Sequence, residues 1–470
     1  MRLRTCATLG AAVLVGFAPT ASGVAVAPPS GTVRVSVSPT GEPDDISARL
    51  SRPSVNRDGS VIAFDSVATN LVRRDTNTVE DVFVRRLGSA VVERVSVNSG
   101  GRQADGDSDW PAVSGGGRQV VFTSSATNLV PGDRNNASDI FLRDLRARTT
   151  TLISSASDGT PGNAPSLTPT ISRDGTFAAF ASDATNLVAG GTPEFTRNIY
   201  VKNIRTGRIF LVSRSVGGAP LSNAAAPAVS NGGRYVSFTS FAPDVVAGDT
   251  NDQVDVFLRD RRLRETTRVS VTSAGAEGDA FSGMPAISAN GQTVAFVSDA
   301  TNLTSADTNA RRDVFVRDVV AGTTSRVSVD SAGVQGNDES DYGIRGASVF
   351  GPSISADGQV VAFGSIASNL VPDDTNTCSF RTLPSFTLPG QCPDIFTHDR
   401  LTEATTRVSV SGAGEQADDA STDPAISGDG RSVAFFSTAS NLAPGDTNTC
   451  RPSLFAGHPG QCPDVYLHTR

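Results

Sequence analysis

Apolar and small residues alternate in a segment that recurs along the whole chain. In its last copy, residues 424–435 (PAISGDGRSVAF), an extended stretch follows a proline, Asp429 and Gly430 interrupt it, and Val433 and Phe435 then alternate with small residues. Such alternation is typical of a half-buried strand, and Asp-Gly favours a tight turn because glycine accepts a positive φ. Each copy therefore predicts two antiparallel strands joined by a hairpin turn.

The segment occurs seven times, at spacings of 58, 58, 58, 58, 67 and 72 residues between its closing phenylalanines. A period of this kind indicates a repeat architecture, in which each unit buries its faces against its neighbours. Two further strands follow in each unit, one like DVFVRD and one like RVSV. Seven units of four short antiparallel strands, here called A to D, predict an all-β, seven-bladed β-propeller. The closing phenylalanines are Phe64, Phe122, Phe180, Phe238, Phe296, Phe363 and Phe435.

The two ends of the repeat region complement each other. Residues 32–37 (TVRVSV) match a D strand that no A, B or C strand precedes, and residues 464–467 (DVYL) match a C strand that no D strand follows. We therefore expect one propeller over residues 31–470, with residues 31–38 completing blade seven. Closing the ring in this way removes two exposed sheet edges.

The first 27 residues have the features of a secretory signal peptide with a short linker. Arg2 and Arg4 precede the apolar stretch 9–17, and small residues follow, with cleavage expected after Gly23. The alternative is an N-terminal membrane anchor, for which the apolar stretch is short. We expect an exported protein, periplasmic, cell-surface or extracellular, that is not inserted in a membrane once the signal is removed.

The combination of SxDGxxVAF with DVFVRD resembles the TolB-type, WD40-like (PD40) propeller repeat of exported bacterial proteins. The resemblance covers essentially everything after the signal and implies a propeller fold. This chain differs from that family in its longer repeats and in having seven blades where the TolB propeller has six. The partners of TolB are therefore not carried over.

Long acidic loops are predicted on one face of the disc, because strand direction alternates within a blade. The B–C and D–A connections share that face, and the tight A–B turns lie on the other. Asp, Asn and Asp recur at i, i+2 and i+6 in the B–C loops, and oxygen ligands at such spacing suit calcium. The alternative is that these side chains cap the loops through Asx-turns. The candidate ligands are Asp75, Asn77, Asp81, Asp133, Asn135, Asp139, Asp249, Asn251, Asp255, Asp307, Asn309, Asp313, Asp374, Asn376, Asp394, Asp446, Asn448 and Asp464.

Blade three serves as an internal control for this hypothesis. It has Gly191, Pro193 and Asn198 in the corresponding region, so a metal site is not expected there.

Four cysteines bracket insertions in the B–C loops of blades six and seven. Both insertions read NTC…GQCPD, and the one in blade six separates Asp374 from Asp394 by 20 residues rather than six. Four cysteines allow three pairings, and equivalent position favours Cys378–Cys392 and Cys450–Cys462. Each disulfide would restore the short-loop geometry of the other blades, and disulfides fit an exported protein.

Little in the sequence points to catalysis or to nucleic acid. The net charge of −8 argues against nucleic acid as a partner. Three histidines are present; His398 and His468 fall on C strands where other blades have arginine, so we expect them to face solvent. The paired carboxylates recur with the repeat, whereas a catalytic pair needs two differently tuned acids.

These observations favour a non-catalytic, monomeric binding scaffold. We expect it to bind a protein or an envelope polysaccharide through the face that bears the D–A and B–C loops. Calcium is the only cofactor that the sequence suggests. The alternative is a propeller-type lyase or hydrolase with its site at the central channel, which an asymmetric group of His, Arg and acid at the channel mouth would favour.

Overall fold

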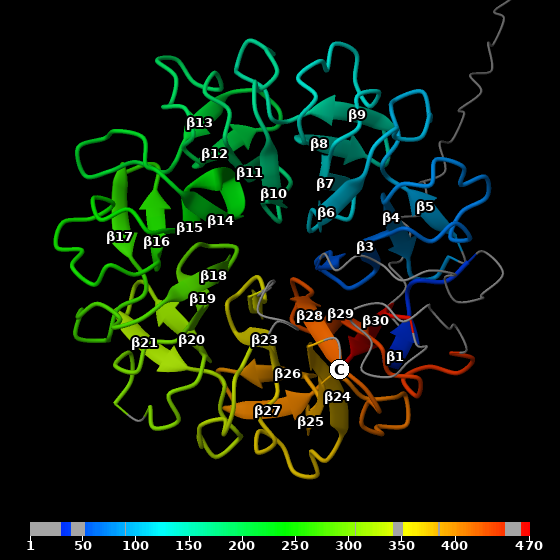
Figure 1. Ribbon diagram of the computed structural model, residues 1–470, viewed down its shortest axis with the longest axis vertical. Coiled ribbons are helices and arrows are strands. Elements are labelled where there is room, and N and C mark those ends of the chain that lie inside the picture. Colours follow the sequence, from blue (N-terminus) through cyan, green and yellow to red (C-terminus); the bar gives the residue numbers. More distant parts are fainter. Residues whose placement is uncertain are drawn as a thin grey trace, which may run out of the picture.

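The computed structural model describes residues 30–38, 52–89, 91–305, 307–341, 351–383, 386–446 and 462–470. It is a ring of seven four-stranded antiparallel sheets, as predicted (Figure 1). The expected signal peptide, Asn448 and Cys450 lie outside the described residues. Within the described part of the chain, no helix is long and apolar enough to cross a membrane.

Each blade runs from strand A near the ring centre to strand D at the rim (Figure 1). Blades one to three are β2 (Ser54–Val55), β3 (Val61–Ser66), β4 (Asp81–Arg86), β5 (Val92–Arg94); β6 (Ser108–Val113), β7 (Gln119–Ser124), β8 (Asp139–Asp144), β9 (Thr149–Leu152); and β10 (Ser166–Ile171), β11 (Phe177–Ser182), β12 (Asn198–Asn203), β13 (Ile209–Leu211). Blades four and five are β14 (Ala224–Val229), β15 (Tyr235–Ser240), β16 (Asp255–Asp260), β17 (Glu265–Arg268); and β18 (Ser282–Ile287), β19 (Thr293–Ser298), β20 (Asp313–Asp318), β21 (Thr323–Arg326). A single 3-10 turn, η1 (Asn231–Gly233), joins β14 to β15.

Blade six carries an extra hairpin. Its sheet is β22 (Ser353–Ile354), β23 (Val360–Ser365), β26 (Asp394–Asp399) and β27 (Ala404–Arg407), and β24 (Thr377–Leu383) pairs with β25 (Phe386–Gln391) inside the B–C loop. Blade seven is β28 (Ser421–Ile426), β29 (Ser432–Ser437), β30 (Asp464–Thr469) and β1 (Gly31–Arg34).

The N-terminal strand closes the ring, as the sequence predicted. Strand β1 pairs antiparallel with β30, in a register that runs from Gly31 opposite Thr469 to Arg34 opposite Tyr466. Beyond the strand, the Val35 amide still donates to the Val465 carbonyl at 2.7 Å. The first and last described segments therefore form one sheet.

The D strands begin earlier than the RVSV motif predicted. They end at or near its arginine; β5, for example, ends at Arg94. The Val95 amide still donates to the Val82 carbonyl of strand C. Two residues later the chain has left the sheet, and Val97 forms an isolated bridge with Gln103. The arginine thus stands at the end of a strand, beside the B–C loop.

Aromatic pairs fill the space between blades. In each blade a ring on strand B stacks or tilts against a ring on strand C, with centroids 5.8–6.0 Å apart. Phe122 and Phe141 of blade two, for example, pack on Ala63 and Val82 of blade one. Because side chains alternate between the two faces of a strand, each blade presents aromatic rings to one neighbour and small residues to the other.

A closed ring of hydrogen bonds joins the A–B turns of neighbouring blades. At Gly115 the neighbouring turn leaves no room for a side chain, because a β-carbon there would lie 2.6 Å from the Arg173 carbonyl oxygen. The blade-to-blade bonds link Arg57 to Gly115, Gly115 to Arg173, Asp174 to the Asn231 side chain, Asn231 to Ala289, Ala289 to Ala356, Ala356 to Gly428, and Gly428 to Asn56. This face of the disc is therefore tied together, and the longer loops lie on the other.

Candidate functional site

The repeated acidic loops hold an internal cation in five blades. In blade five, the Arg326 guanidinium of strand D lies 3.3 Å from Asp307 and 3.1 Å from Asp313. The same pairing joins Arg94 to Asp75 and Asp81, Arg268 to Asp249 and Asp255, Arg407 to Asp374 and Asp394, and Arg34 to Asp446 and Asp464. The arginine neutralises the two carboxylates at the place where the sequence predicted calcium.

The asparagines of these loops act as clamps. In blade four, the Asn251 amide donates to Asp255 and to the Gly278 carbonyl, while its oxygen accepts from the Gln253 amide. Asn135 in blade two and Asn309 in blade five accept a backbone amide two residues on in the same way. This is the Asx-turn arrangement that was the alternative to calcium.

Blade two keeps the acids and lacks the arginine. Leu152 stands at the end of its D strand, where five of the six other blades have the arginine. Burial raises the pKa of Asp139 to about 6; hydrogen bonds from Ser154 and Asn135 oppose this, and the charge of Asp133 adds to it. Among the predicted calcium loops whose acids are all described, this one holds its carboxylates without an arginine.

Blade three lacks the two acids of the loop, as its sequence indicates, and it also lacks the arginine of strand D. Leu211 ends its D strand, and Asn198 accepts a hydrogen bond from Ser213 in place of the usual carboxylate. That calcium does not bind in blade three stays a prediction.

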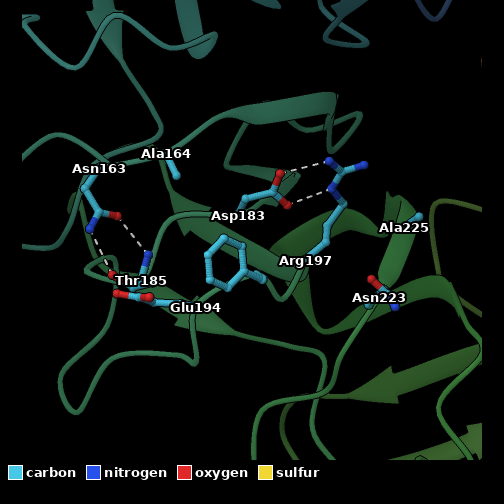
Figure 2. A pocket seen from close by; sticks show the side chains of 10 residues that line it. Asn163, Ala164, Asp183, Thr185, Glu194, Arg197, Asn223 and Ala225 are labelled. Carbon is cyan, nitrogen blue, oxygen red and sulfur yellow. Dashed lines mark hydrogen bonds and ion pairs between the residues drawn. The ribbon is translucent and has the colours of Figure 1, made fainter.

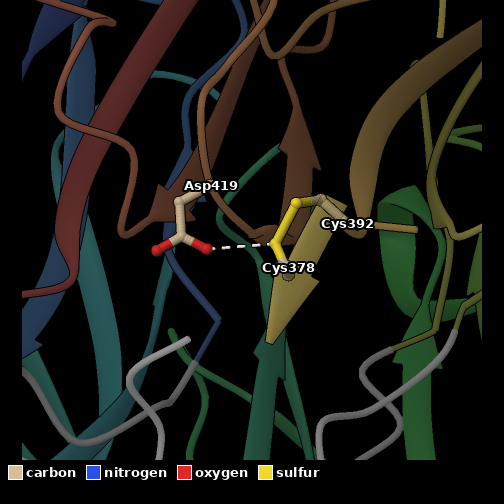
Figure 3. A group of neighbouring side chains, drawn as sticks. All are labelled: Cys378, Cys392 and Asp419. Carbon is tan, nitrogen blue, oxygen red and sulfur yellow. Dashed lines mark hydrogen bonds between the residues drawn. A yellow bond between two sulfur atoms is a disulfide. The ribbon is translucent and has the colours of Figure 1, made fainter. Parts of the chain in front are cut away.

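The disulfide of blade six restores the loop geometry, as expected. Cys378 and Cys392 are bonded to each other and lie at the base of the β24–β25 hairpin (Figure 3). Arg407 therefore reaches both Asp374 and Asp394, at 3.3 and 3.9 Å, although 20 residues separate these acids. Cys462 is also disulfide-bonded, and its expected partner Cys450 lies outside the described residues.

Asp419 lies against this disulfide. Its Oδ1 is 3.0 Å from the Cys378 sulfur (Figure 3). The two sulfurs and the carboxylate lie within 4.8 Å of one another, the one such group of three metal-ligand side chains among the described residues. Since the sulfurs are bonded to each other, they are not available as thiolate ligands.

The central channel encloses a cavity of about 510 Å³ lined by the A strands. Its lining is mostly apolar, with prolines, Trp110 and Met284. At the end of the channel nearest the A–B turns, Arg173 of blade three donates to the Ile354 carbonyl of blade six at 2.7 Å. Burial lowers the pKa of Arg173 to about 10. This side chain crosses the channel beside the ring of turns.

A charged group from three blades lies at the start of the A strands. Arg52 donates to the Pro424 carbonyl, and its charge acts on the buried carboxylates of Asp341 and Asp423. Burial raises the pKa of Asp341 to about 8, which the charge of Arg52 opposes, and it raises the pKa of Asp423 to about 6. This group breaks the seven-fold pattern, and sequence reasoning missed it because its members come from different repeats.

Neither described histidine lies at the channel. His398, on β26 in blade six, is 2% exposed and contacts Thr405 and Glu403, so the expectation that it faces solvent is wrong. His468, on β30, is half-buried beside Thr32. Both side chains pack against the neighbouring D strand, which explains why arginine, with its long apolar stem, takes the same position in other blades.

A pocket of about 630 Å³ opens on the loop face between blades three and four. Arg197 holds Asp183 through two hydrogen bonds of 2.8 and 2.9 Å (Figure 2). On its other side, Asn163 exchanges hydrogen bonds with the amide and hydroxyl of Thr185. Glu194, Phe195 and Asn223 complete the lining, and Phe195 is 96% exposed.

A second exposed aromatic residue follows a strand that borders this pocket. Phe241 is 56% exposed and follows Ser240, which pairs with the pocket residue Ala224. Phe195 and Phe241 are the exposed aromatic residues of the described part of the chain, and both belong to B–C loops of adjacent blades. Exposed apolar surface at the edge of a pocket is a feature of partner-binding and ligand-binding sites.

No protein-family model and no curated protein matches this sequence. The chain has the fold of known propeller proteins. An oligogalacturonate lyase in complex with manganese aligns over 93% of this chain and 92% of its own, at 11% identity and a TM-score of 0.51. The oligogalacturonate lyase from Vibrio parahaemolyticus aligns over the same shares at 12% identity and a TM-score of 0.51.

TolB is also among the structural neighbours. TolB from Acinetobacter baumannii aligns with 78% of this chain at 15% identity and a TM-score of 0.39, and the match spans 65% of TolB's own length. At these identities the likeness shows the fold alone. What this propeller does has to be argued from its own residues.

Proposed function

We propose that this protein is an exported, non-catalytic propeller that binds a protein or an envelope glycan through its D–A and B–C loops. The observation that carries this proposal is the exposed ring of Phe195 in a pocket on that face, with a second exposed ring, Phe241, in the B–C loop of the next blade. Aromatic residues are enriched among the residues that dominate binding energy at interfaces. The opposite face offers tight turns joined by hydrogen bonds, which leave little room for a partner.

Two features support export. The N-terminal residues have the basic, apolar and small-residue regions of a signal peptide. The Cys378–Cys392 disulfide persists most readily in an oxidising compartment. We propose that the mature protein is a monomer, since the ring is closed within one chain.

Calcium remains part of the proposal only for blade two. Asp133, Asn135 and Asp139 are the described calcium candidates that have no arginine beside them. In five blades the guanidinium already supplies the positive charge that the carboxylates require.

The test of the binding proposal compares the two faces. The experiment measures retention of the purified protein on the washed envelope fraction of the cells that produce it. We expect the double variant Phe195→Ala/Phe241→Ala to bind at least about ten-fold more weakly. The matched control replaces Leu263 and Leu401, which are 59% and 77% exposed in C–D turns on the other face. If the control loses binding instead, or neither variant does, the proposal is wrong.

A lyase or hydrolase with its site at the channel is the second candidate. The Arg52, Asp341 and Asp423 group favours it, because a carboxyl with a raised pKa beside an arginine is suited to acid–base chemistry. Incubation with polygalacturonate, followed by ultraviolet absorbance for unsaturated product and by reducing-end release, tests both reactions. Turnover that Asp341→Asn abolishes would establish this candidate, and absence of turnover would reject it for this substrate.

A further inference from the structure

Phe195 occupies a backbone position that suits it poorly. Its counterparts, three residues before each C strand, are Thr78, Asn136, Asp252 and Ala310. All five positions have φ between 51° and 60°, the left-handed region that bulky residues rarely adopt. A phenylalanine here combines an unfavourable backbone conformation with a ring that is 96% exposed. Neither property helps folding, and such combinations persist where the residue serves a ligand.

Polar groups without internal partners stand around this ring. Glu194 and Asn223 are exposed, line the same pocket and form no hydrogen bond or ion pair within the described ranges. Arg197 and Asp183 hold each other in a fixed geometry while 41% and 30% of their side chains stay exposed. The pocket thus offers a carboxylate acceptor, an amide that can donate and accept, and an aromatic plane.

A sugar ring matches this set of groups. One face of a pyranose carries mostly C–H groups, which pack on an aromatic plane, while its rim carries hydroxyls that both donate and accept hydrogen bonds. The volume of about 630 Å³ lies within the range of small-molecule sites. A peptide would instead require apolar side pockets or a free sheet edge, whereas the A and B strands beside this pocket are already paired with each other.

Charge narrows the class of sugar. The Arg197 guanidinium is already bound by Asp183 through two hydrogen bonds, whereas no cation of the described residues forms an ion pair with Glu194. A uronate would therefore bring its carboxylate toward an uncompensated negative charge. We propose that this pocket binds a neutral sugar unit of a polysaccharide, stacked on Phe195. This inference rests on the proposed binding function and specifies its ligand.

Affinity electrophoresis in native gels tests the inference with four probes: dextran, glucomannan, glycol chitin and polygalacturonate. We expect at least one of the three neutral polysaccharides to retard the protein, and polygalacturonate to leave its mobility unchanged. Phe195→Ala should weaken the retardation at least about ten-fold, while Phe195→Trp should preserve it. The matched control is Asn136→Ala, which alters the same loop position of blade two and should have no effect.

Three outcomes would overturn the inference: no retardation in any neutral gel, retardation by polygalacturonate alone, or retardation that Phe195→Ala does not change. The envelope fraction separates this failure from failure of the binding function. If protease treatment of that fraction abolishes retention and periodate treatment does not, the face binds a protein and the sugar site is wrong. If the untreated fraction retains nothing, the binding function itself is wrong.

Discussion

The hydroxyl of Thr32 lies 2.9 Å from Nδ1 of His468, although 436 residues separate them in the chain. The contact joins β1 to β30 and marks the seam of the ring. Four residues farther along the seam, the Ser36 hydroxyl donates to the Asp464 carboxylate at 2.5 Å and accepts from the Val465 amide at 3.0 Å. The seam is thus held by side chains as well as by the strand ladder, so its loss should affect the whole propeller.

The first prediction concerns this seam. Val35 is fully buried between blades seven and one, and Val35→Asp places a carboxylate in an apolar cluster. We expect the free energy of unfolding to fall by about 3 kcal/mol or more. Urea denaturation followed by circular dichroism measures the change. Val334→Asp, at a position that is 54% exposed, is the control and should be nearly neutral; equal effects would contradict the closure.

The second prediction concerns the buried arginines. Arg326→Met leaves Asp307 and Asp313 without their cation, and removing one partner of a buried ion pair costs about 3–5 kcal/mol. Chemical denaturation of the variant checks the loss. Arg311→Met removes the half-exposed pairs with Asp338 and Glu339 and should cost less than about 1 kcal/mol. If the two variants lose similar amounts of unfolding free energy, burial does not make the Arg326 ion pairs more important than the exposed ones.

The third prediction concerns calcium in blade two. If Asp133 and Asp139 take the ion, calcium raises the melting temperature of the protein and chelator lowers it, because a ligand that binds only the native state stabilises it. Leu152→Arg should abolish the shift, since it recreates the ion pair of five other blades. Differential scanning calorimetry with and without calcium measures both. A wild-type protein that does not respond, or a Leu152→Arg variant that still does, would reject the site.

The fourth prediction concerns pH. The pKa of Asp341 is about 8 in the folded protein and about 3.9 in the unfolded chain, so the folded state binds more protons between these values. The free energy of unfolding should therefore fall as pH rises through this window, by up to about 1.4 kcal/mol per unit, and level off above about 8. Asp341→Asn should reduce this slope and be the more stable protein at pH 8.

Denaturation at a series of pH values measures the slope. The control Asp252→Asn changes an exposed carboxylate and should leave the slope as it is. If Asp341→Asn also leaves it unchanged, Asp341 is ionised at neutral pH in the folded protein, and its place in an acid–base group at the channel would be lost as well.

Much of the fold could be predicted from local pattern. The period of the phenylalanines, the Asp-Gly turns and the unmatched strand at each end are visible in the sequence, because each repeat carries its own strand and turn signals. The Cys378–Cys392 pairing was also accessible, since both cysteines bracket an insertion at an equivalent loop position. These features depend on short segments, and the alternation of side chains across a strand translates them directly into structure.

The sequence contains a signal for the arginine that pairs with the acidic loops. Arg326 follows Asp307 by nineteen residues, and the same spacing joins Arg94 to Asp75 and Arg268 to Asp249. Five blades carry the arginine together with both acids and blade three lacks all of them, although blade two keeps its acids without the arginine. The sequence pattern predicts strand D over the whole RVSV motif, and only the pairing of strands C and D shows that its arginine ends beside the B–C loop.

By itself, then, the sequence determined the number of blades, the way the ring closes and which face bears the long loops. Only the tertiary structure decided what those loops and the channel contain. Arg52, Asp341 and Asp423 come from three blades, and Phe195 gains its pocket from a neighbouring blade. The physical reason is that a repeat encodes contacts within itself and with its immediate neighbours. Groups that break the symmetry form where different blades converge, at distances along the chain that no local pattern records.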